Sequence, residues 1–317
     1  MCDCLVAVGR PTLFAKNSDR PPDERQVVEW FPPRRDEDAV RTTHIDVPGA
    51  GRPTLGFLGS RPTWAWGVEH GVNSAFVAVG NETVYTTLDP RGAEPGLPGI
   101  DLVRLALERA ATAAAAVDVI TSLVSQFGQG GSGHQGRDRP YWSSFLVADP
   151  AGAFVVETSG REWEVEAVGP GGRRAISNRT TIPSFDARHR HPRQPVALYV
   201  DPRWEASKAV LARDRVDVAS LKAHLRSHVG GDDGWTVCMH VDGVEATTGA
   251  LVASLPGPAR FLVGSPCQSV FVPLNVGPVP SFPGGAVGPA PDVEEELERD
   301  FRFGDPTWNA EAVGRLG

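Results

Sequence analysis

The chain is patterned as short apolar runs separated by glycine, proline and polar residues, as expected for many short strands joined by turns. Leu5 to Val8 and Thr12 to Ala15 are two such runs, and the break at Gly9-Arg10-Pro11 predicts that they form a β-hairpin. Phe76 to Val79 is apolar at every position, which predicts a central strand buried on both faces. From Tyr141 onward, further runs and turns predict a β-meander.

Helical periodicity interrupts the strands in two regions. Asp101 to Arg109 has apolar residues three to four positions apart, and the alanine-rich run Ala113 to Gln126 follows, with Thr112 as its expected N-cap and Gly128 at its end. Arg203 to Val229 is also mostly helical in pattern. The order strands, helices, strands, helices, strands predicts an α+β domain in which helices cover an antiparallel sheet sandwich, rather than a doubly wound parallel sheet.

Composition narrows the classes of function. The 317 residues carry a formal net charge of −8, and this acidic balance argues against a nucleic-acid partner. No apolar stretch approaches the ~20 residues of a membrane span, and the first residues lack the basic start of a signal peptide. We therefore expect a cytoplasmic protein with reduced thiols and no membrane partner. The cysteines are too few and too scattered for a disulfide scaffold: Cys2, Cys4, Cys238 and Cys267.

The predicted hairpin gathers reactive groups at one edge of a sheet. Antiparallel pairing brings the segment Lys16-Asn17-Ser18-Asp19-Arg20 beside the start of the first strand, where Cys2 follows Met1. Because Cys2 is small, removal of Met1 would leave it with a free α-amine. With a pKa of about 7.7–8.0, this amine could accept the proton of a thiol whose own pKa is about 8.5, and a nearby cation would favour the thiolate. The alternative is that Cys2 and Cys4 are small apolar residues near a chain end.

Two tryptophans and two asparagines stand out elsewhere. Trp64 and Trp66 are one residue apart, a spacing that suits one buried ring and one ring lining a groove, although core packing is the more common outcome. Asn81 comes after the buried run and Gly80, so we expect its amide to project into a site at the exit of the strand; the alternative is a simple turn residue. Asn178 likewise ends a predicted strand.

A metal site is a weaker interpretation of the cysteines. Cys238 and His240 would point to the same face of a predicted strand, and Cys2-x-Cys4 could supply two more ligands. A Cys-x-Cys pair on a strand with two distant ligands is a poor match to the usual zinc-binding spacings. We therefore predict no metal and no cofactor.

Several blocks of the sequence fall in a specific order. They are Met1-Cys-Asp-Cys-Leu-Val-Ala-Val, Phe14-Ala-Lys-Asn-Ser-Asp-Arg-Pro21, Asp23-Glu-Arg-Gln26, Arg61-Pro-Thr-Trp-Ala-Trp-Gly67, Gly80-Asn-Glu82, Asp101-Leu-Val-Arg-Leu-Ala-Leu-Glu-Arg109, Ile176-Ser-Asn178 and Cys238-Met-His240. Together they resemble the secernin and cysteine-dipeptidase family. The resemblance covers residues 1–274, which we take as one catalytic domain, and leaves 275–317 as a Pro/Gly-rich and acidic C-terminal extension. It implies the four-layer αββα sandwich of the N-terminal-nucleophile hydrolases.

The resemblance also implies roles for particular residues. Cys2 is the implied nucleophile with its own amine as base, Asp19 lies near that amine, and Asn81 and Asn178 shape the oxyanion hole and hold the amine. Lys16 stands where choloylglycine-hydrolase relatives carry an arginine. The residues that we expect to contact the substrate are Lys16, Asn17, Arg20, Trp64 and Trp66. Many members of the family have threonine where this chain has Cys4, which makes Cys4 a rival nucleophile.

The leading hypothesis is a cysteine amidohydrolase that cleaves dipeptides or other small N-acyl amides through an acyl-enzyme. One alternative is an acyltransferase of the same fold, in which an amine replaces water. Another is a non-catalytic, secernin-like regulatory protein. The expected partner is a small peptide or acyl amide, and a homo-oligomer is left open.

Overall fold

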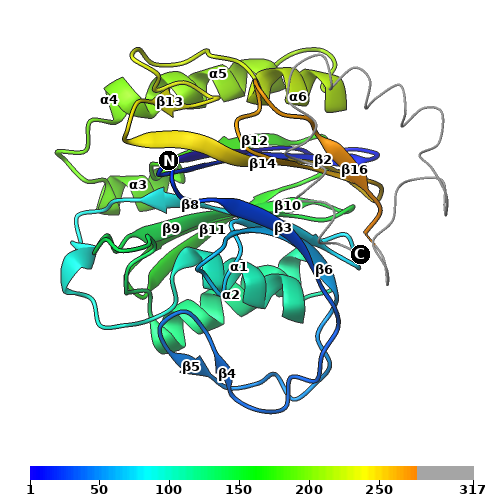
Figure 1. Ribbon diagram of the computed structural model, residues 1–317, viewed down its shortest axis with the longest axis vertical. Coiled ribbons are helices and arrows are strands. Elements are labelled where there is room, and N and C mark those ends of the chain that lie inside the picture. The colour runs from blue at the N-terminus through cyan, green and yellow to red at the C-terminus, as the bar shows by residue number, and fades with distance from the viewer. Residues whose placement is uncertain (277–317) are drawn as a thin grey trace.

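The computed structural model describes residues 1–276, so the predicted C-terminal extension lies almost entirely outside the described residues. Two sheets lie face to face, and helices cover the outer face of each, as Figure 1 shows. Helices α5 (Asp201–Leu211) and α6 (Val218–Leu225) cover the first sheet, and α1 (Gly99–Arg109) and α2 (Ala113–Phe127) cover the second. The predicted four-layer αββα sandwich is confirmed.

Both sheets are antiparallel. The first runs in the order β12 (Arg173–Ile176), β1 (Cys2–Ala7), β2 (Thr12–Arg20), β14 (Glu245–Leu255), β15 (Ala259–Val263) and β16 (Val272–Leu274), with β13 (His240–Val241) also paired to β14. The second runs in the order β11 (Glu162–Val168), β10 (Ala153–Ser159), β9 (Trp142–Ala148), β8 (Ala78–Val84), β7 (His70–Asn73), β6 (Phe57–Pro62) and β3 (Gln26–Phe31). The remaining elements are β4 (Val40–Arg41), β5 (Asp46–Val47), α3 (Pro183–His189) and α4 (Val196–Tyr199).

Each interface between neighbouring layers contains its own apolar cluster. Val6 and Leu251 of the first sheet pack with Leu146 of the second between the two sheets. Ala250 and its neighbours on the outer face of the first sheet pack instead on α5 and α6, while the second sheet buries its outer face on α1 and α2. Successive residues of a strand face opposite sides of the sheet. A strand with apolar residues at adjacent positions can therefore pack on the other sheet with one face and on helices with the other.

The opening hairpin is longer than the apolar pattern predicts. β2 extends through the polar segment to Arg20, because β14 pairs along its other edge and holds these residues in the sheet. In the pairing of β1 with β2, Cys2 lies opposite Ser18 and Asp3 lies opposite Asn17. The expected meeting of Cys2 with the end of β2 is therefore present, and it occurs inside a sheet rather than at a frayed edge.

The strand that carries Asn81 differs from its prediction. The expected strand was Phe76 to Val79, but Phe76 has a positive φ of 60° and precedes the strand, which runs from Ala78 to Val84. Asn81 thus lies in the middle of β8, opposite Phe145 of β9, and not at the exit of the strand. Pairing with β9 keeps these polar residues extended. The prediction of a central strand buried on both faces is confirmed, since β8 lies between β7 and β9.

A β-bulge interrupts the pairing of β14 with β2. Ser18 lies opposite Gly249 and Asp19 lies opposite Thr247, so Thr248 is the extra residue of the bulged strand. Directly paired residues point to the same side of a sheet, which places Thr247 on the same face as Asp19. Among residues 1–276, no helix has the length and apolar character needed to cross a membrane.

Candidate active site

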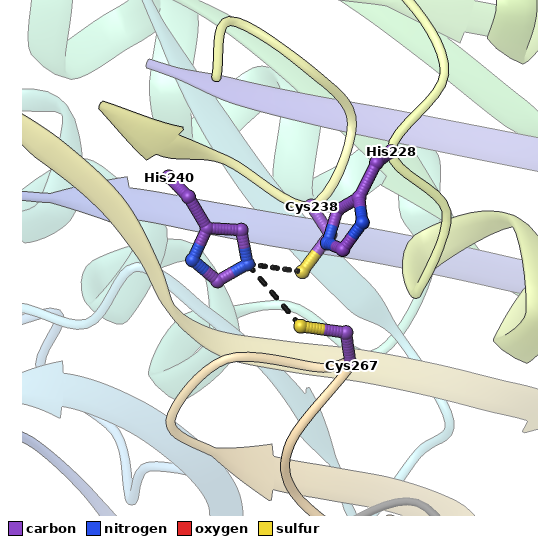
Figure 2. Close-up of side chains that lie close together, drawn as sticks. All are labelled: His228, Cys238, His240 and Cys267. Atoms are coloured by element: carbon purple, nitrogen blue, oxygen red, sulfur yellow. Dashed lines mark hydrogen bonds between the residues drawn. The ribbon is translucent and has the colours of Figure 1, made fainter. Parts of the chain in front are cut away.

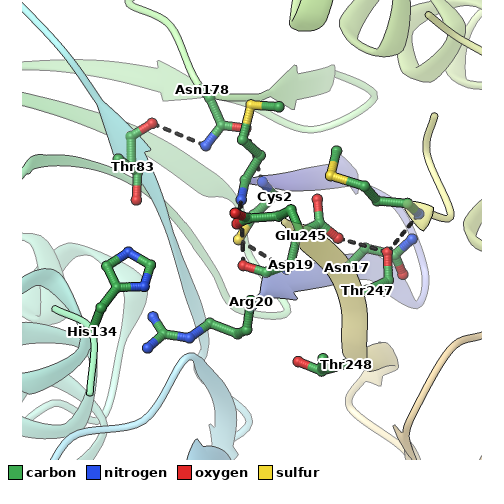
Figure 3. Close-up of polar contacts among 12 residues, drawn as sticks. Cys2, Asn17, Asp19, Arg20, Thr83, His134, Asn178, Glu245, Thr247 and Thr248 are labelled. Carbon is green, nitrogen blue, oxygen red and sulfur yellow. Dashed lines mark hydrogen bonds and ion pairs between the residues drawn. The ribbon is translucent and has the colours of Figure 1, made fainter. Parts of the chain in front are cut away.

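A cavity of about 680 Å³ lies at the start of β1 and the end of β2, and β8 of the second sheet also lines it. Its size is typical of small-molecule sites. It brings together all four predicted catalytic residues, although they come from β1, β2, β8 and the segment after β12. The predicted residues that line it are Cys2, Asp19, Arg20, Asn81 and Asn178. Figure 3 shows the polar contacts around Cys2.

The two cysteines of β1 differ in their access to this cavity. Cys2 lines it and retains 5% of its surface exposed. Cys4 is fully buried between the sheets, where its Sγ would lie 3.1 Å from a Cβ placed on Gly80. Cys4 is absent from the cavity lining, so a substrate in the cavity would reach Cys2 first.

The main-chain nitrogen of Cys2 is held by Asn178. The Cys2 N–H donates to Asn178 Oδ1 at 2.8 Å, and Asn178 Nδ2 donates in turn to the carbonyl of Thr83 at 3.0 Å. Arg203 Nη2 donates to the same Oδ1 at 2.9 Å. Asn178 therefore connects β1, β8 of the second sheet and α5, and it fixes the nitrogen that would become the α-amine of Cys2 after loss of Met1.

Asp19 lies on the other side of Cys2. Its backbone N–H donates to the Met1 carbonyl at 2.8 Å and approaches Cys2 Sγ at 3.5 Å. Asp19 Oδ1 accepts from Thr247 Oγ1 at 2.6 Å, whereas Oδ2 is buried and has no hydrogen-bond partner among the described residues. Burial, only partly offset by the nearby N-terminal ammonium and Arg203, raises the pKa of Asp19 to about 7. One carboxylate oxygen is thus free to accept a further hydrogen bond.

Met1 occupies the edge of the cavity. Its ammonium group forms an ion pair with Glu245 and donates to the Asp19 carbonyl at 3.3 Å. Glu245 lies at the start of β14 and also lines the cavity. An α-amino group next to Cys2 is therefore bound by a carboxylate when Met1 is present.

The thiol of Cys2 faces buried charges of both signs. Burial raises the pKa of Cys2 to about 12, and the charge of Lys16 opposes this shift while Glu82 adds to it. Burial likewise raises the pKa of Glu82 to about 8, again opposed by Lys16, whose Nζ lies 4.0 Å from Glu82 Oε1. With Met1 attached, the thiol is protonated and a poor nucleophile.

Asn81 and Asn178 both line the cavity, but they differ in the bonding of the side-chain oxygen. Asn178 Oδ1 accepts hydrogen bonds from Cys2 and Arg203, whereas Asn81 Oδ1 accepts none from the described residues. The side chain of Asn81 is 2% exposed. Its Nδ2 lies close to α1, since a Cβ on Gly99 would approach it within 2.6 Å. Glycine at position 99 therefore leaves room for the amide at the cavity wall.

Four of the five residues predicted to contact the substrate do not line the cavity, so these predictions are wrong. They are Asn17, Trp64, Trp66 and Lys16. Asn17 points to the helical face and donates to the carbonyls of Leu225 and Val237 at 2.9 and 2.8 Å. Trp64 donates to Glu24 at 3.2 Å, and Trp66 packs under the guanidinium of Arg104 at 4.1 Å; neither lines the cavity. Lys16 is fully buried between the sheets, so its charge reaches Cys2 but its side chain does not line the cavity.

Arg20 does line the cavity, but both of its sides are already paired. It forms ion pairs with Glu24 and with Glu69, the latter at 3.1 Å, and donates to the carbonyl of Gly133 at 2.7 Å. These bonds fix the guanidinium at the cavity wall. Any contact with a substrate would add to an existing network.

Arg203 is a central residue of the site that the sequence reading missed. It is fully buried, and its Nη1 donates to Asp3 Oδ2 at 2.6 Å and lies 3.8 Å from Asp19 Oδ2. It sits in the first turns of α5, about two hundred positions from Cys2. Its local pattern gives no signal, because an arginine in an amphipathic helix normally faces water. Thr247 and Glu245 were also missed, because they too lie far from Cys2 along the chain.

No protein-family model matches the chain. Solved structures do match it over most of its length. A C2A mutant of the conjugated bile acid hydrolase from Clostridium perfringens aligns with a TM-score of 0.55 and 13% sequence identity, covering 87% of this chain and 92% of that one. The penicillin V acylase from Agrobacterium tumefaciens aligns with a TM-score of 0.53 and 15% identity, covering 86% of each chain. This chain has an N-terminal-nucleophile hydrolase fold. At these identities the likeness concerns the fold, and the resemblance to the secernins stays a prediction.

Proposed function

We propose that the protein is a cysteine amidohydrolase whose nucleophile is Cys2, made competent by removal of Met1. The observation that carries this proposal is the position of the Cys2 nitrogen, held by Asn178 at 2.8 Å beside the cavity that the Cys2 thiol also lines. Loss of Met1 would turn this nitrogen into an α-amine next to the thiol. It would also remove the residue that now lies over Cys2.

The reaction then follows from groups within reach of one another. The α-amine takes the proton of the Cys2 thiol, and the thiolate sulfur attacks the carbonyl carbon of the substrate amide. The side-chain amide of Asn81 stabilises the oxyanion of the tetrahedral intermediate. As the carbon–nitrogen bond breaks, the leaving amine takes the proton from the Cys2 ammonium, and a thioester remains. Water attacks the thioester with the α-amine again accepting a proton, which releases the acid and restores the thiol.

Asp19, Asn178 and Arg203 prepare the amine for this role. Asn178 Oδ1 accepts from the nitrogen, and the unpartnered Asp19 Oδ2 offers a second acceptor for the ammonium form. Arg203 bonds to Asn178 and lies near Asp19, so it keeps both side chains in place. Arg203 has a positioning role, because it is absent from the cavity lining.

A dipeptide substrate is supported by the way Met1 is bound. Glu245 pairs with the Met1 ammonium directly beside Cys2, and after Met1 is removed this carboxylate is available to the α-amino group of a substrate. Asp19 also lines the cavity, whereas the charge of Glu69 is already paired with Arg20. A bare acyl amide without an amino group would leave Glu245 buried and unpaired, which is costly. The geometry therefore favours substrates with a free N-terminus.

The decisive experiment compares two tagged versions of the full chain. The intact mass of a C-terminally tagged protein should lack Met1, and this protein should hydrolyse free dipeptides much faster than their N-acetylated forms. A version with an uncleaved N-terminal tag should fold but show no hydrolysis. Full activity in both versions would overturn the role of the α-amine. Equal rates on free and acetylated dipeptides would leave amide hydrolysis intact and remove the argument from Glu245.

A further inference from the structure

A second group of reactive side chains lies on the helical side of the first sheet, apart from the cavity. It consists of two histidines and two cysteines from three segments: His228 after α6, Cys238 and His240 at β13, and Cys267 in the turn before β16. Figure 2 shows the four side chains converging on a common centre. One ligand atom from each residue can be chosen so that all four lie within 4.8 Å of one another.

The separations suit a single tetrahedral ion. His240 Nε2 lies 3.4 Å from Cys238 Sγ and 3.2 Å from Cys267 Sγ. In a tetrahedral zinc site with Zn–S of about 2.3 Å and Zn–N of about 2.0–2.1 Å, a nitrogen and a sulfur ligand lie about 3.6 Å apart. The imidazole rings of His228 and His240 are nearly perpendicular, with an interplanar angle of 78° and centroids 5.1 Å apart. Their nitrogens can therefore approach the centre from different directions.

The donor set also selects the ion. Two thiols and two imidazoles, with no carboxylate in the group, are ligands of zinc rather than of magnesium or calcium. His228, His240 and Cys267 line a small surface hollow, which gives an ion a path from solvent.

We propose that His228, Cys238, His240 and Cys267 bind one Zn²⁺ ion in a closed structural site. All four positions of the ion are filled by protein ligands, which is the arrangement of structural rather than catalytic zinc. The sequence predicted no metal, and the weaker interpretation with Cys2 and Cys4 as ligands does not hold, because Cys2 lines the cavity and Cys4 is buried between the sheets. Cys238 and His240, which that interpretation had considered, lie beside His228 and Cys267 instead, and Cys238 precedes the strand rather than sharing it with His240.

The position of the site shows what it would stabilise. Met239 lies between two ligands, and its N–H donates to Thr247 Oγ1 at 2.8 Å while its carbonyl accepts from Thr247 N–H at 3.0 Å. Two residues before Cys267, Ser265 Oγ donates to the Thr247 carbonyl at 3.1 Å. Thr247 is the residue that donates to Asp19 Oδ1. The ion would therefore fix, from two sides, the strand segment that holds Asp19 in place.

The test measures metal content, which does not depend on any enzymatic activity. Full-length protein, purified under reducing conditions without added metal, should contain about one zinc per chain by elemental analysis. Replacement by Co²⁺ should give visible absorption of a tetrahedral site together with thiolate-to-cobalt charge-transfer bands. Another metal held by the same ligands would overturn the choice of zinc. A reduced protein that binds neither Zn²⁺ nor Co²⁺ would overturn the site itself.

Ligand variants and a matched control locate the ion. Cys267→Ser and His228→Ala alter partly or fully exposed positions, so both should fold, and each should weaken Zn²⁺ binding by at least about 10²-fold in a chelator competition. Cys2→Ser removes a buried thiol outside the cluster and should retain full zinc. Equal zinc loss in Cys2→Ser and Cys267→Ser would contradict the proposal. So would a Cys238–Cys267 disulfide, seen as the loss of two hydrogens in the intact mass, in a protein that takes up no metal once reduced.

Discussion

Cys2 in β1 and Cys238 in the segment before β13 are both buried thiols, but their neighbours are of different kinds. Cys2 is surrounded by charged groups of both signs, with Lys16 and Glu82 behind it and Asp19 beside it. Cys238 is surrounded by His228, His240 and Cys267, with no carboxylate in the group. The first environment can move protons, and the second can hold a soft cation. A buried cysteine thus acquires its chemistry from the side chains that face it.

The two sites also differ in how the chain assembles them. Cys2 and Asp19 are brought together by one hairpin, so their approach is decided within the first twenty residues. The cluster of Cys238 depends on three segments that meet only after α6, β13 and the turn before β16 have packed. Thr247 joins the two, since it bonds to Asp19 and to Met239, which lies between two residues of the cluster. The comparison can be tested by changes that should affect one site and leave the other intact.

The largest effect is expected from Cys2→Ser. Serine is small enough to permit Met1 removal, but it is a far weaker nucleophile here, so kcat/KM for dipeptides should fall by at least about 10³-fold. Thermal stability and zinc content should stay close to those of the parent protein. Cys4→Ser, which changes the thiol that does not line the cavity, is the matched variant and should keep most of the activity. An inactive Cys4→Ser with an active Cys2→Ser would reverse the assignment of the nucleophile.

Asn81→Ala and Asn17→Ala should separate catalysis from assembly. Asn81→Ala removes the proposed oxyanion donor and should lower kcat by about 10²–10³-fold, or about 2.7–4 kcal/mol, with little change in KM. Asn17→Ala leaves the carbonyls of Leu225 and Val237 unpaired and should cost about 1–3 kcal/mol of unfolding free energy.

The two variants should also differ in Zn²⁺ binding. Because Val237 precedes Cys238, Asn17→Ala should also weaken Zn²⁺ binding, whereas Asn81→Ala should not. Steady-state kinetics, urea denaturation and metal analysis measure the three quantities. A loss of tenfold or less in Asn81→Ala, shared between kcat and KM at normal stability, would make Asn81 a structural residue of β8.

The smallest effect is expected from the titration of Asp19 in protein that retains Met1. Its pKa is raised from 3.8 to about 7, so the folded state binds this proton more tightly than the unfolded state. The stability contributed by the protonated form is present below about pH 4 and is lost as pH rises toward 7. Asp19→Asn cannot ionise, so its unfolding free energy relative to the parent should increase from pH 5 to pH 8.

The size of this change should be a few kcal/mol at most, since one pKa unit corresponds to about 1.4 kcal/mol. Urea denaturation at the two pH values measures it, and Met1 retention is checked by mass. A difference between the two proteins that is independent of pH, or that decreases toward pH 8, would contradict a raised pKa of Asp19. Zinc content should be unchanged.

The sequence predicted those parts of the candidate site whose residues lie close together along the chain, and it failed for parts that depend on contacts between distant segments. The hairpin was predicted because its two strands are contiguous and its turn is marked by Gly9 and Pro11. Asn81 was identified although its strand was misplaced, because an apolar run reveals the buried part of a strand and not the polar part that neighbouring strands hold in place. Trp64 and Trp66 were misassigned, because they lie in the loop after β6, and their spacing does not say which way a loop residue points.

Residues supplied from far along the chain gave no such signal. Arg203 reaches Asp3 and Asn178 only because α5 packs across β1 and β12. His228 and Cys267 reach Cys238 only through packing of separate loops, so half of the cluster was noticed and the other half was not. Predicting these partners would require the tertiary arrangement first.

Because of the bulge at Thr248, the geometry of the candidate active site depends on the number of residues in β14. With regular pairing, Thr247 would lie on the same face as Gly249, toward the second sheet, and its hydroxyl could not reach Asp19. The single extra residue turns it to the other face. Substitutions along this stretch change one contact at a time, whereas a one-residue deletion there would exchange the two faces for every position before it. Natural or engineered variants should therefore tolerate changes of side chain in this strand far better than insertions or deletions.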